Sequence, residues 1–364
     1  MITHAYRHGG DVWSVKAQGD ARQWIDFSAN INFLGLSPQV KAAMVNAIDD
    51  VIHYPDPHCR HLRAALSTHL QVPTAAIAAG NGAVDLLDQW LRTVQPRRVL
   101  ITDPGFGQYL RAIKSVGAEA VVMRLTEQNQ FAFDGEAWQR AMQLGQCDSA
   151  ILCSPHNPVG WTWTKEQRDQ VLARAEKAGI HLLVDESFLD FLPDGRGRSC
   201  VATAAQSAQV AVLYSLTKFF ALPGIRLGAL IAHPARIAAL EAQRDPWSVN
   251  HLAQVAGVAA LQDQAYQEQT WNQLPALREQ LIHTLRAIPG CRPYSSTVNF
   301  VLADIRATSL PAPVWTGRLR DRGLLVRDCS TFDGLGSGYL RFAVRPAPAI
   351  EQLGAAMKEV LAQR

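Results

Sequence analysis

Short apolar runs alternate with longer amphipathic stretches between about residues 75 and 233. Runs of this kind are typical of buried strands, and they span residues 97–102, 118–125, 149–154, 181–185, 210–215 and 228–232. Helix-like segments over 82–93 and 165–177 begin after Asn81 and Thr164, two residue types that cap helices well. The alternation predicts an α/β fold with a mostly parallel central sheet sandwiched by helices.

The pattern changes after about residue 250 to long helices rich in Ala, Leu and Gln. Three strand candidates follow, over 299–304, 323–327 and 339–344. These elements predict a second, smaller α+β domain. Residues 1–45 hold too little apolar material for a core of their own, so we expect them to join the small domain or a partner chain. We therefore predict a large domain over 46–245 and a small one formed by an N-terminal arm, 1–45, with 246–364.

Composition narrows the class of partner. At 364 residues the chain can bury the cores of two domains, and its formal net charge of +3 comes without a basic block. We expect a small-molecule partner and no nucleic acid. The six cysteines are scattered without a C-x-x-C pair or zinc-like spacing, which predicts reduced thiols in a cytoplasmic protein and no metal site. The N-terminus does not resemble a signal peptide, and the apolar stretches are shorter than a membrane span.

Lys218 comes shortly after the apolar run 210–215. A desolvated lysine near a second cation loses its proton more easily, and Arg226 lies eight residues further on. The freed amine is nucleophilic towards an aldehyde, which favours a lysine that holds pyridoxal phosphate as a Schiff base. A solvated surface charge is the alternative for any single lysine.

Polar residues close to other strand candidates fit the ring of the same cofactor. Asp185 ends the run 181–185, where a carboxylate can keep the pyridinium nitrogen protonated; a helix cap is the alternative. Asn157 can donate to the ring hydroxyl oxygen, although Asn-Pro is also a turn signal. Tyr109 can stack on the ring face, with simple packing as its alternative.

Small and polar residues provide candidates for the phosphate end. Gly82 and Ala83 stand at a predicted helix start, where backbone N–H groups and the helix dipole favour an anion. Ser215, Thr217 and Arg226 can complete a phosphate cup. An ordinary turn is the alternative for the glycine pair.

Taken in order, these motifs resemble the fold-type I pyridoxal-phosphate enzymes of the histidinol-phosphate aminotransferase branch. The matching pieces run from Gly80-Asn81-Gly82 to Tyr339-Leu340-Arg341 and cover nearly the whole chain. The resemblance implies an aspartate aminotransferase-like fold and assigns Lys218 to the Schiff base, Asp185 to the pyridinium, Asn157 to the hydroxyl side and Tyr109 to stacking.

Tyr54, in His53-Tyr54-Pro55-Asp56, resembles a tyrosine that reaches the cofactor phosphate of the neighbouring subunit. The resemblance therefore implies a homodimer with shared active sites.

Two segments resemble the threonine-phosphate decarboxylases of this branch. They are His8-Gly9-Gly10 and the stretch from Asp26 to Asn32. A chance motif in a terminal arm is the alternative. Phe188 also stands where transaminating relatives commonly have a tyrosine, although it is equally suited to packing.

Three arginines near the C-terminus have guanidinium groups that can bind anions. Arg341 and Arg345 share one face of a predicted strand because side chains alternate, and Arg327 ends another strand candidate. Such groups suit a substrate with a phosphate and a carboxylate. By resemblance, Arg327 and Arg341 bind these anionic groups, while the other substrate-binding residues are His8, Gly9, Asn32 and Asn157.

The resemblance thus implies decarboxylation of O-phospho-L-threonine to (R)-1-aminopropan-2-yl phosphate, the linker of the cobalamin nucleotide loop. One alternative is an aminotransferase acting on histidinol phosphate or an aromatic amino acid. Another is a cofactor-binding or assembly protein without turnover, against which intact Lys218, Asp185 and Asn157 argue.

Overall fold

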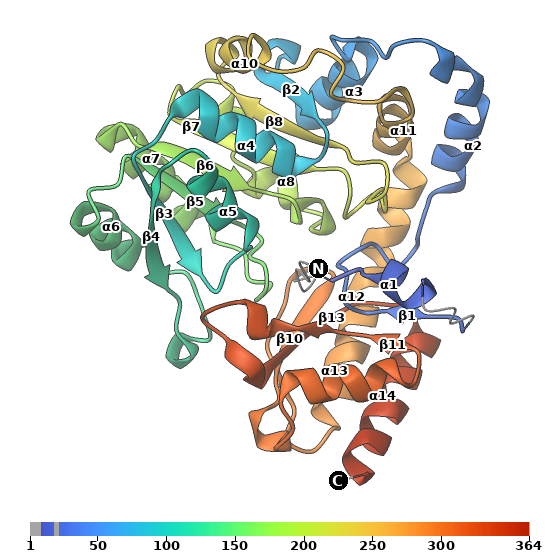
Figure 1. The fold of residues 1–364 in the computed structure, drawn as a ribbon. Coiled ribbons are helices and arrows are strands. Elements are labelled where there is room, and N and C mark those ends of the chain that lie inside the picture. Colours follow the sequence, from blue (N-terminus) through green and yellow to red (C-terminus); the bar gives the residue numbers. More distant parts are fainter. Residues whose placement is uncertain (1–8, 18–21, 364) are drawn as a thin grey trace. The chain divides into compact units, whose positions relative to one another are not determined.

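The apolar runs after residue 75 form a seven-stranded sheet in the computed structural model, which describes residues 9–17 and 22–363 (Figure 1). The strand order is β2-β8-β7-β6-β5-β3-β4, with β8 antiparallel to both neighbours and every other pair parallel. The strands are β2 (Ile77–Gly80), β3 (Arg98–Asp103), β4 (Glu119–Arg124), β5 (Ser149–Cys153), β6 (His181–Asp185), β7 (Val210–Ser215) and β8 (Gly228–Ala232). The predicted mostly parallel sheet is confirmed, and β2 is a strand that the pattern did not predict.

Helices on one face of this sheet form a buried core with it. They are α4 (Ala83–Val94), α5 (Gln108–Ser115) and α10 (Pro234–Glu241). Trp90, Ile113 and Ile237 from these helices join strand residues such as Leu183 and Leu213 in one apolar cluster. Burial of this cluster fixes the strand ends that carry the candidate site.

Two helix starts were predicted from capping residues. Thr164 caps α7 (Lys165–Ala178) in a capping box with Gln167, as predicted. The prediction of Asn81 as a cap is wrong, because Gly82 with φ +89° occupies that position before α4. The Asn81 amide instead donates to Asp85.

The chain divides into two compact units. The large unit comprises Leu34–Asn157 and Trp161–Trp271, and the small unit comprises Pro158–Gly160, Asn272 onward and the described residues up to Phe33. Residues 34–45 and 246–271, which we expected in the small domain, thus fall in the large unit. The reason is that α11 (His251–Gln262) packs against α2 (Pro38–Asn46) and α3 (Arg60–Leu70). The remaining helices of the large unit are α6 (Gly135–Leu144), α8 (Gly195–Arg198) and α9 (Val201–Ala204), and α12 (Gln264–Arg286) begins there.

The small unit holds an antiparallel sheet of order β12-β13-β10-β9 and a parallel pair, β1-β11. Its strands are β1 (Ile25–Asp26), β9 (Arg292–Pro293), β10 (Phe300–Asp304), β11 (Leu324–Leu325), β12 (Arg327–Asp328) and β13 (Tyr339–Ala343), and its helices are α1 (Val12–Lys16), α13 (Ala312–Arg320) and α14 (Ala347–Ala362). The strand predicted over 323–327 is in fact two short strands in different sheets.

All six cysteines lie in the described part of the chain, where they are buried and unbonded to one another. Across residues 9–17 and 22–363, no helix combines the length and the apolar character needed to cross a membrane.

Candidate active site

The register of the large sheet brings several predicted site residues to one edge. Gly228 at the start of β8 pairs with both Gly80 and Ser215, the last residues of β2 and β7. Asp185, the last residue of β6, pairs with Cys153 at the end of β5. Because parallel strands end together, the residues that follow β2, β5, β6 and β7 share this edge, where open α/β sheets bind ligands.

Lys218 lies in the turn that follows β7. Its side chain is half-buried, whereas Thr217 and Phe219 on either side are buried. A lysine so placed at the sheet edge is accessible to a cofactor aldehyde, with which its amine can form a Schiff base.

The N-terminus of α4 forms a cradle with Arg226. A Cβ atom at Gly82 would lie 2.6 Å from Nη2 of Arg226, and one at Gly228 would lie 2.7 Å from the Ala83 amide nitrogen. Only glycine therefore lets the backbone and the guanidinium approach so closely. The hydroxyls of Ser215, the last residue of β7, and Thr217 lie 2.8 Å apart. Backbone N–H groups, a guanidinium and hydroxyls together suit a phosphate.

Asp185 is held by hydrogen bonds at the end of β6. Its Oδ2 accepts from the Tyr109 hydroxyl at 2.6 Å, and its Oδ1 accepts from the Ser187 amide at 2.9 Å. Burial, with Asp185 beside it, raises the pKa of Tyr109 well above its usual value, so the hydroxyl stays a donor. Asp185 is thus a fixed carboxylate, suited to a pyridinium nitrogen.

Tyr109 lies in the core cluster, with its ring edge-on to Phe106 at 5.5 Å. Its stacking on a cofactor ring stays a prediction. The hydroxyl contact with Asp185 was missed, because nothing in the sequence signals a pairing across 76 residues.

Asn157 follows β5 and is 9% exposed. Its neighbour His156 stacks on Trp161, with ring centroids 4.8 Å apart. Burial lowers the pKa of His156 to about 3, so this imidazole is neutral. Phe188 is buried with its ring near Phe191, which is consistent with packing.

Two arginines face each other across strands of the small unit. Arg327 on β12 pairs in register with Arg341 on β13, and both side chains are buried. Arg327 donates to the Thr331 hydroxyl at 2.6 Å, and Arg341 donates to the Ser28 carbonyl at 3.1 Å. Burial lowers the pKa of Arg341 to about 9, and the charge of Arg327 acts in the same direction. Since like charges directly opposite each other are unfavourable, this arginine pair is suited to a bound anion.

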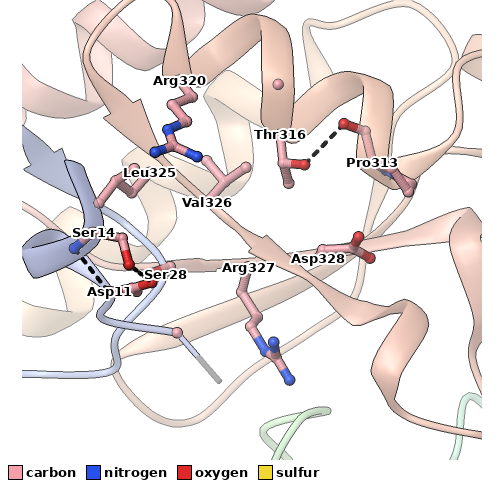
Figure 2. A pocket seen from close by; sticks show the side chains of 12 residues that line it. Asp11, Ser14, Ser28, Pro313, Thr316, Arg320, Leu325, Val326, Arg327 and Asp328 are labelled. Atoms are coloured by element: carbon pink, nitrogen blue, oxygen red, sulfur yellow. Dashed lines mark hydrogen bonds between the residues drawn. The ribbon is translucent and has the colours of Figure 1, made fainter. Parts of the chain in front are cut away.

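A cavity of about 300 Å³ in the small unit includes two of the predicted substrate residues, Gly9 and Arg327 (Figure 2). Gly9, Ser28 and Arg327 line it, and Arg320 adds a further guanidinium. A Cβ atom at Gly9 would collide with the Ser28 carbonyl, which explains glycine at that position. Asn32 is also in the small unit and is buried, whereas His8 lies outside the described residues.

Arg345 has different hydrogen-bond partners from Arg327 and Arg341. It donates to backbone carbonyls, among them that of Asp26, instead of forming a second fork beside Arg341 as expected. The sequence pattern missed this because β13 ends at Ala343, so strand alternation does not extend to residue 345.

Tyr54 lies on the surface of the large unit. It is 81% exposed, and its ring centroid is 4.8 Å from that of Trp247.

The model of the family "aminotransferase class I and II" matches residues 22–360 of this chain. The chain belongs to this family. Threonine-phosphate decarboxylase of Salmonella typhimurium is 35% identical to it, over 93% of this chain and 92% of the relative. Histidinol-phosphate aminotransferase of Thermoanaerobacter pseudethanolicus is 29% identical, over 88% and 86% respectively. The structure of histidinol-phosphate aminotransferase from Sinorhizobium meliloti in complex with pyridoxal-5'-phosphate is similar, with a TM-score of 0.82, 24% identity and coverage of 92% of this chain and 90% of that one.

The predicted resemblance and the fold-type I architecture are thereby confirmed, and pyridoxal phosphate is the cofactor of this enzyme. The residues at the edge of the large sheet fit it. The cradle of Gly82 and Arg226 has the donors that a phosphate needs, and Asp185 presents a buried carboxylate.

Proposed function

We propose that this enzyme decarboxylates O-phospho-L-threonine to (R)-1-aminopropan-2-yl phosphate, the linker of the cobalamin nucleotide loop. The observation that carries the proposal is the buried, cross-strand pair of Arg327 and Arg341. The similarity to the threonine-phosphate decarboxylase of Salmonella typhimurium supports it.

The charge of the arginine pair favours a substrate with two anionic groups. Two guanidinium groups side by side offer two sets of N–H donors to anionic groups. A phosphorylated amino acid supplies a phosphate and a carboxylate, whereas histidinol phosphate supplies only the phosphate. The arginine pair thus supports the amino acid as the substrate.

When bound, pyridoxal phosphate would supply an electron sink for the α-carbon of the substrate, and the orientation of the substrate would then select the bond that breaks. Residues that orient the substrate therefore decide the reaction. We assign to Arg327 and Arg341 the task of binding the anionic groups of the substrate and so fixing its orientation. Asn157 and Asp185 hold the cofactor ring from the large unit.

Loss of carbon dioxide leaves an electron pair on the α-carbon that must receive a proton. We assign the delivery of this proton to Nζ of Lys218, because a half-buried amine at this sheet edge can act as a general acid. The carboxylate carbon leaves as carbon dioxide, and the amino group stays on the product.

The alternative is an aminotransferase acting on histidinol phosphate or an aromatic amino acid. The histidinol-phosphate aminotransferase relative supports it. An aminotransferase needs a 2-oxo acid as the amino acceptor, whereas a decarboxylase needs no second substrate.

A substrate panel separates these functions. The purified protein, loaded with pyridoxal phosphate, is incubated with O-phospho-L-threonine, O-phospho-L-serine or histidinol phosphate, each with and without 2-oxoglutarate. We expect phosphothreonine alone to give aminopropanol phosphate, identified by phosphorus NMR. Product only with 2-oxoglutarate would instead support transamination, and no product in any mixture would support a protein without turnover.

We also propose a homodimer in which Tyr54 reaches the cofactor phosphate of the partner subunit. Apolar side chains cluster in the segment around η1 (Ile48–Ile52) and are well exposed: Val45, Ile48, Val51, Ile52 and Tyr54. Patches of this kind mark interfaces. Location in the cytoplasm stays a prediction.

A further inference from the structure

Arg345 binds an irregular loop of the small unit through its whole guanidinium group. Nε donates to the Asp26 carbonyl at 2.7 Å, and Nη2 donates to the Ala29 carbonyl at 2.7 Å. Nη1 donates to the carbonyls of Ile31 at 2.7 Å and Val344 at 3.0 Å. Three of these four acceptors belong to one segment, residues 26–32, which we name the anchor loop.

The carboxylate of Asp26 binds the same loop through its own donors. Its Oδ1 accepts from the Ser28 amide at 2.7 Å, the Ser28 hydroxyl at 2.6 Å and the Ala29 amide at 3.2 Å. After β1 the loop has no regular secondary structure, and these side-chain hydrogen bonds supplement the backbone bonds that Phe27 makes with Leu325 and Ala343. Arg345 and Asp26 therefore both help to hold the shape of the anchor loop.

The anchor loop contacts the proposed substrate residues. The Ser28 carbonyl accepts from Nη2 of Arg341 at 3.1 Å, and the Ser28 hydroxyl accepts from the Gly10 amide at 2.7 Å. Gly9 packs directly on the same carbonyl, and Asn32 lies at the end of the loop. A shift of Ser28 would thus move both a guanidinium and the glycine segment.

Arginine is needed for these contacts because of its shape. Its planar fork has five N–H donors in fixed directions, whereas lysine offers a single compact charge. Each of the three guanidinium nitrogens bonds a different carbonyl of the loop, whereas lysine has one nitrogen for all three. A lysine at 345 would keep the positive charge but release the loop.

We propose that Arg345 is a positioning residue that holds the anchor loop so that Arg341 and Gly9 bind the anionic groups of the substrate. This inference rests on the proposed function. Arg345 acts through the loop and makes its contacts with backbone carbonyls.

Two variants test this role. Arg345→Lys and Arg345→Met should both raise the KM for O-phospho-L-threonine by about 10- to 100-fold, because small displacements of binding groups are this costly. The absorbance of the bound cofactor and its affinity should not change, since the cofactor site is built in the large unit. The matched control is Arg322→Lys, which removes a guanidinium bonded to Glu359, Gln363 and the Arg318 carbonyl in the same unit. It should keep the wild-type KM.

A binding measurement separates this inference from the proposed function. Calorimetry with inorganic phosphate should show at least tenfold weaker binding to Arg345→Lys than to the wild type. A wild-type protein that does not consume phosphothreonine would refute the proposed function, while the phosphate titration would still decide the role of Arg345. The inference is overturned if Arg345→Lys keeps both KM and phosphate affinity. It is also overturned if the variant loses cofactor affinity in parallel, which would indicate general unfolding.

Discussion

At the scale of single residues, the contact between Tyr109 and Asp185 links the core of the large unit to the cofactor site. The tyrosine ring belongs to the apolar cluster, while its hydroxyl orients the buried carboxylate at 2.6 Å. A hydrogen bond to a charged group contributes about 1.5–3 kcal/mol in such surroundings. Tyr109 therefore helps to keep the Asp185 carboxyl group correctly oriented.

Replacing Tyr109 by Phe should weaken pyridoxal-phosphate affinity about tenfold, because roughly 1.4 kcal/mol of orientation is lost. Titration of the apoprotein with pyridoxal phosphate, followed by absorbance, measures this affinity. The control is Tyr266→Phe, which removes another hydroxyl donor in the large unit, bonded to the Gly35 carbonyl at 2.8 Å. Equal cofactor affinities in the two variants would show that the Asp185 contact has no special role.

Residues that follow strands could be found from the sequence, whereas their partners could not. Lys218 and Asp185 stand beside apolar runs, so the pattern alone places them at a sheet edge. The acceptors of Arg345 are backbone carbonyls, which every residue possesses. No residue type therefore marks the anchor loop.

At the scale of elements, the end of β6 carries two successive carboxyl groups with different surroundings. Asp185 bonds Tyr109, whereas Glu186 accepts from the Ser199 hydroxyl and the Cys200 amide, each at 2.6 Å. Burial raises the pKa of Glu186 from 4.5 to about 7, although both hydrogen bonds oppose the shift. Glu186 is thus protonated in the folded state under mildly acidic conditions.

Because the pKa of Glu186 differs between the folded protein and the unfolded chain, the free energy of unfolding depends on pH. The folded protein binds the Glu186 proton more tightly than the unfolded chain does, so the stabilisation is complete below pH 4.5 and is lost as pH rises through about 7. Glu186→Gln stays neutral, and its stability relative to the wild type should rise by up to about 3 kcal/mol between pH 4.5 and pH 8. Urea unfolding of the wild type and the variant at both pH values measures the difference in their free energies of unfolding. A pH-independent difference, equal to that of the exposed Glu119→Gln control, would contradict it.

The strands β3 to β8 of the large unit were predictable to within about one residue, because buried strands read as continuous apolar runs, whereas β2 was missed. The strand break within the segment 323–327 could not be predicted from such a run. Leu324 pairs with Ile25 of β1, while Arg327 pairs with Arg341 of β13, so two different partners divide the segment. Only tertiary pairing decides such a break.

At the scale of the whole molecule, the two units contribute different chemistry. The large unit contains the residues that fit the cofactor, and the small unit contains the arginine pair and the anchor loop. The family and its cofactor could be predicted from ordered motifs along the chain. The domain division could not, because α2 and α11 are joined by packing between distant segments.

The proposed homodimer predicts that Ile52→Glu dissociates the protein. Ile52 is 81% exposed, and a charge placed in an apolar interface is costly. Sedimentation velocity should show monomer, with weaker cofactor binding because Tyr54 of the partner is lost. The control is Leu144→Glu, at an 86% exposed position on α6. Identical sedimentation of wild type and Ile52→Glu would contradict the interface.

The most direct test of the proposed reaction follows the carboxyl carbon of the substrate. O-phospho-L-threonine labelled at this carbon is incubated with the cofactor-loaded wild type and with Lys218→Ala, without any 2-oxo acid. We predict that the wild type releases one labelled carbon dioxide for each molecule of aminopropanol phosphate formed, and that Lys218→Ala releases almost none. Label that stays in an amino or 2-oxo acid, with turnover that depends on added 2-oxoglutarate, would contradict the account.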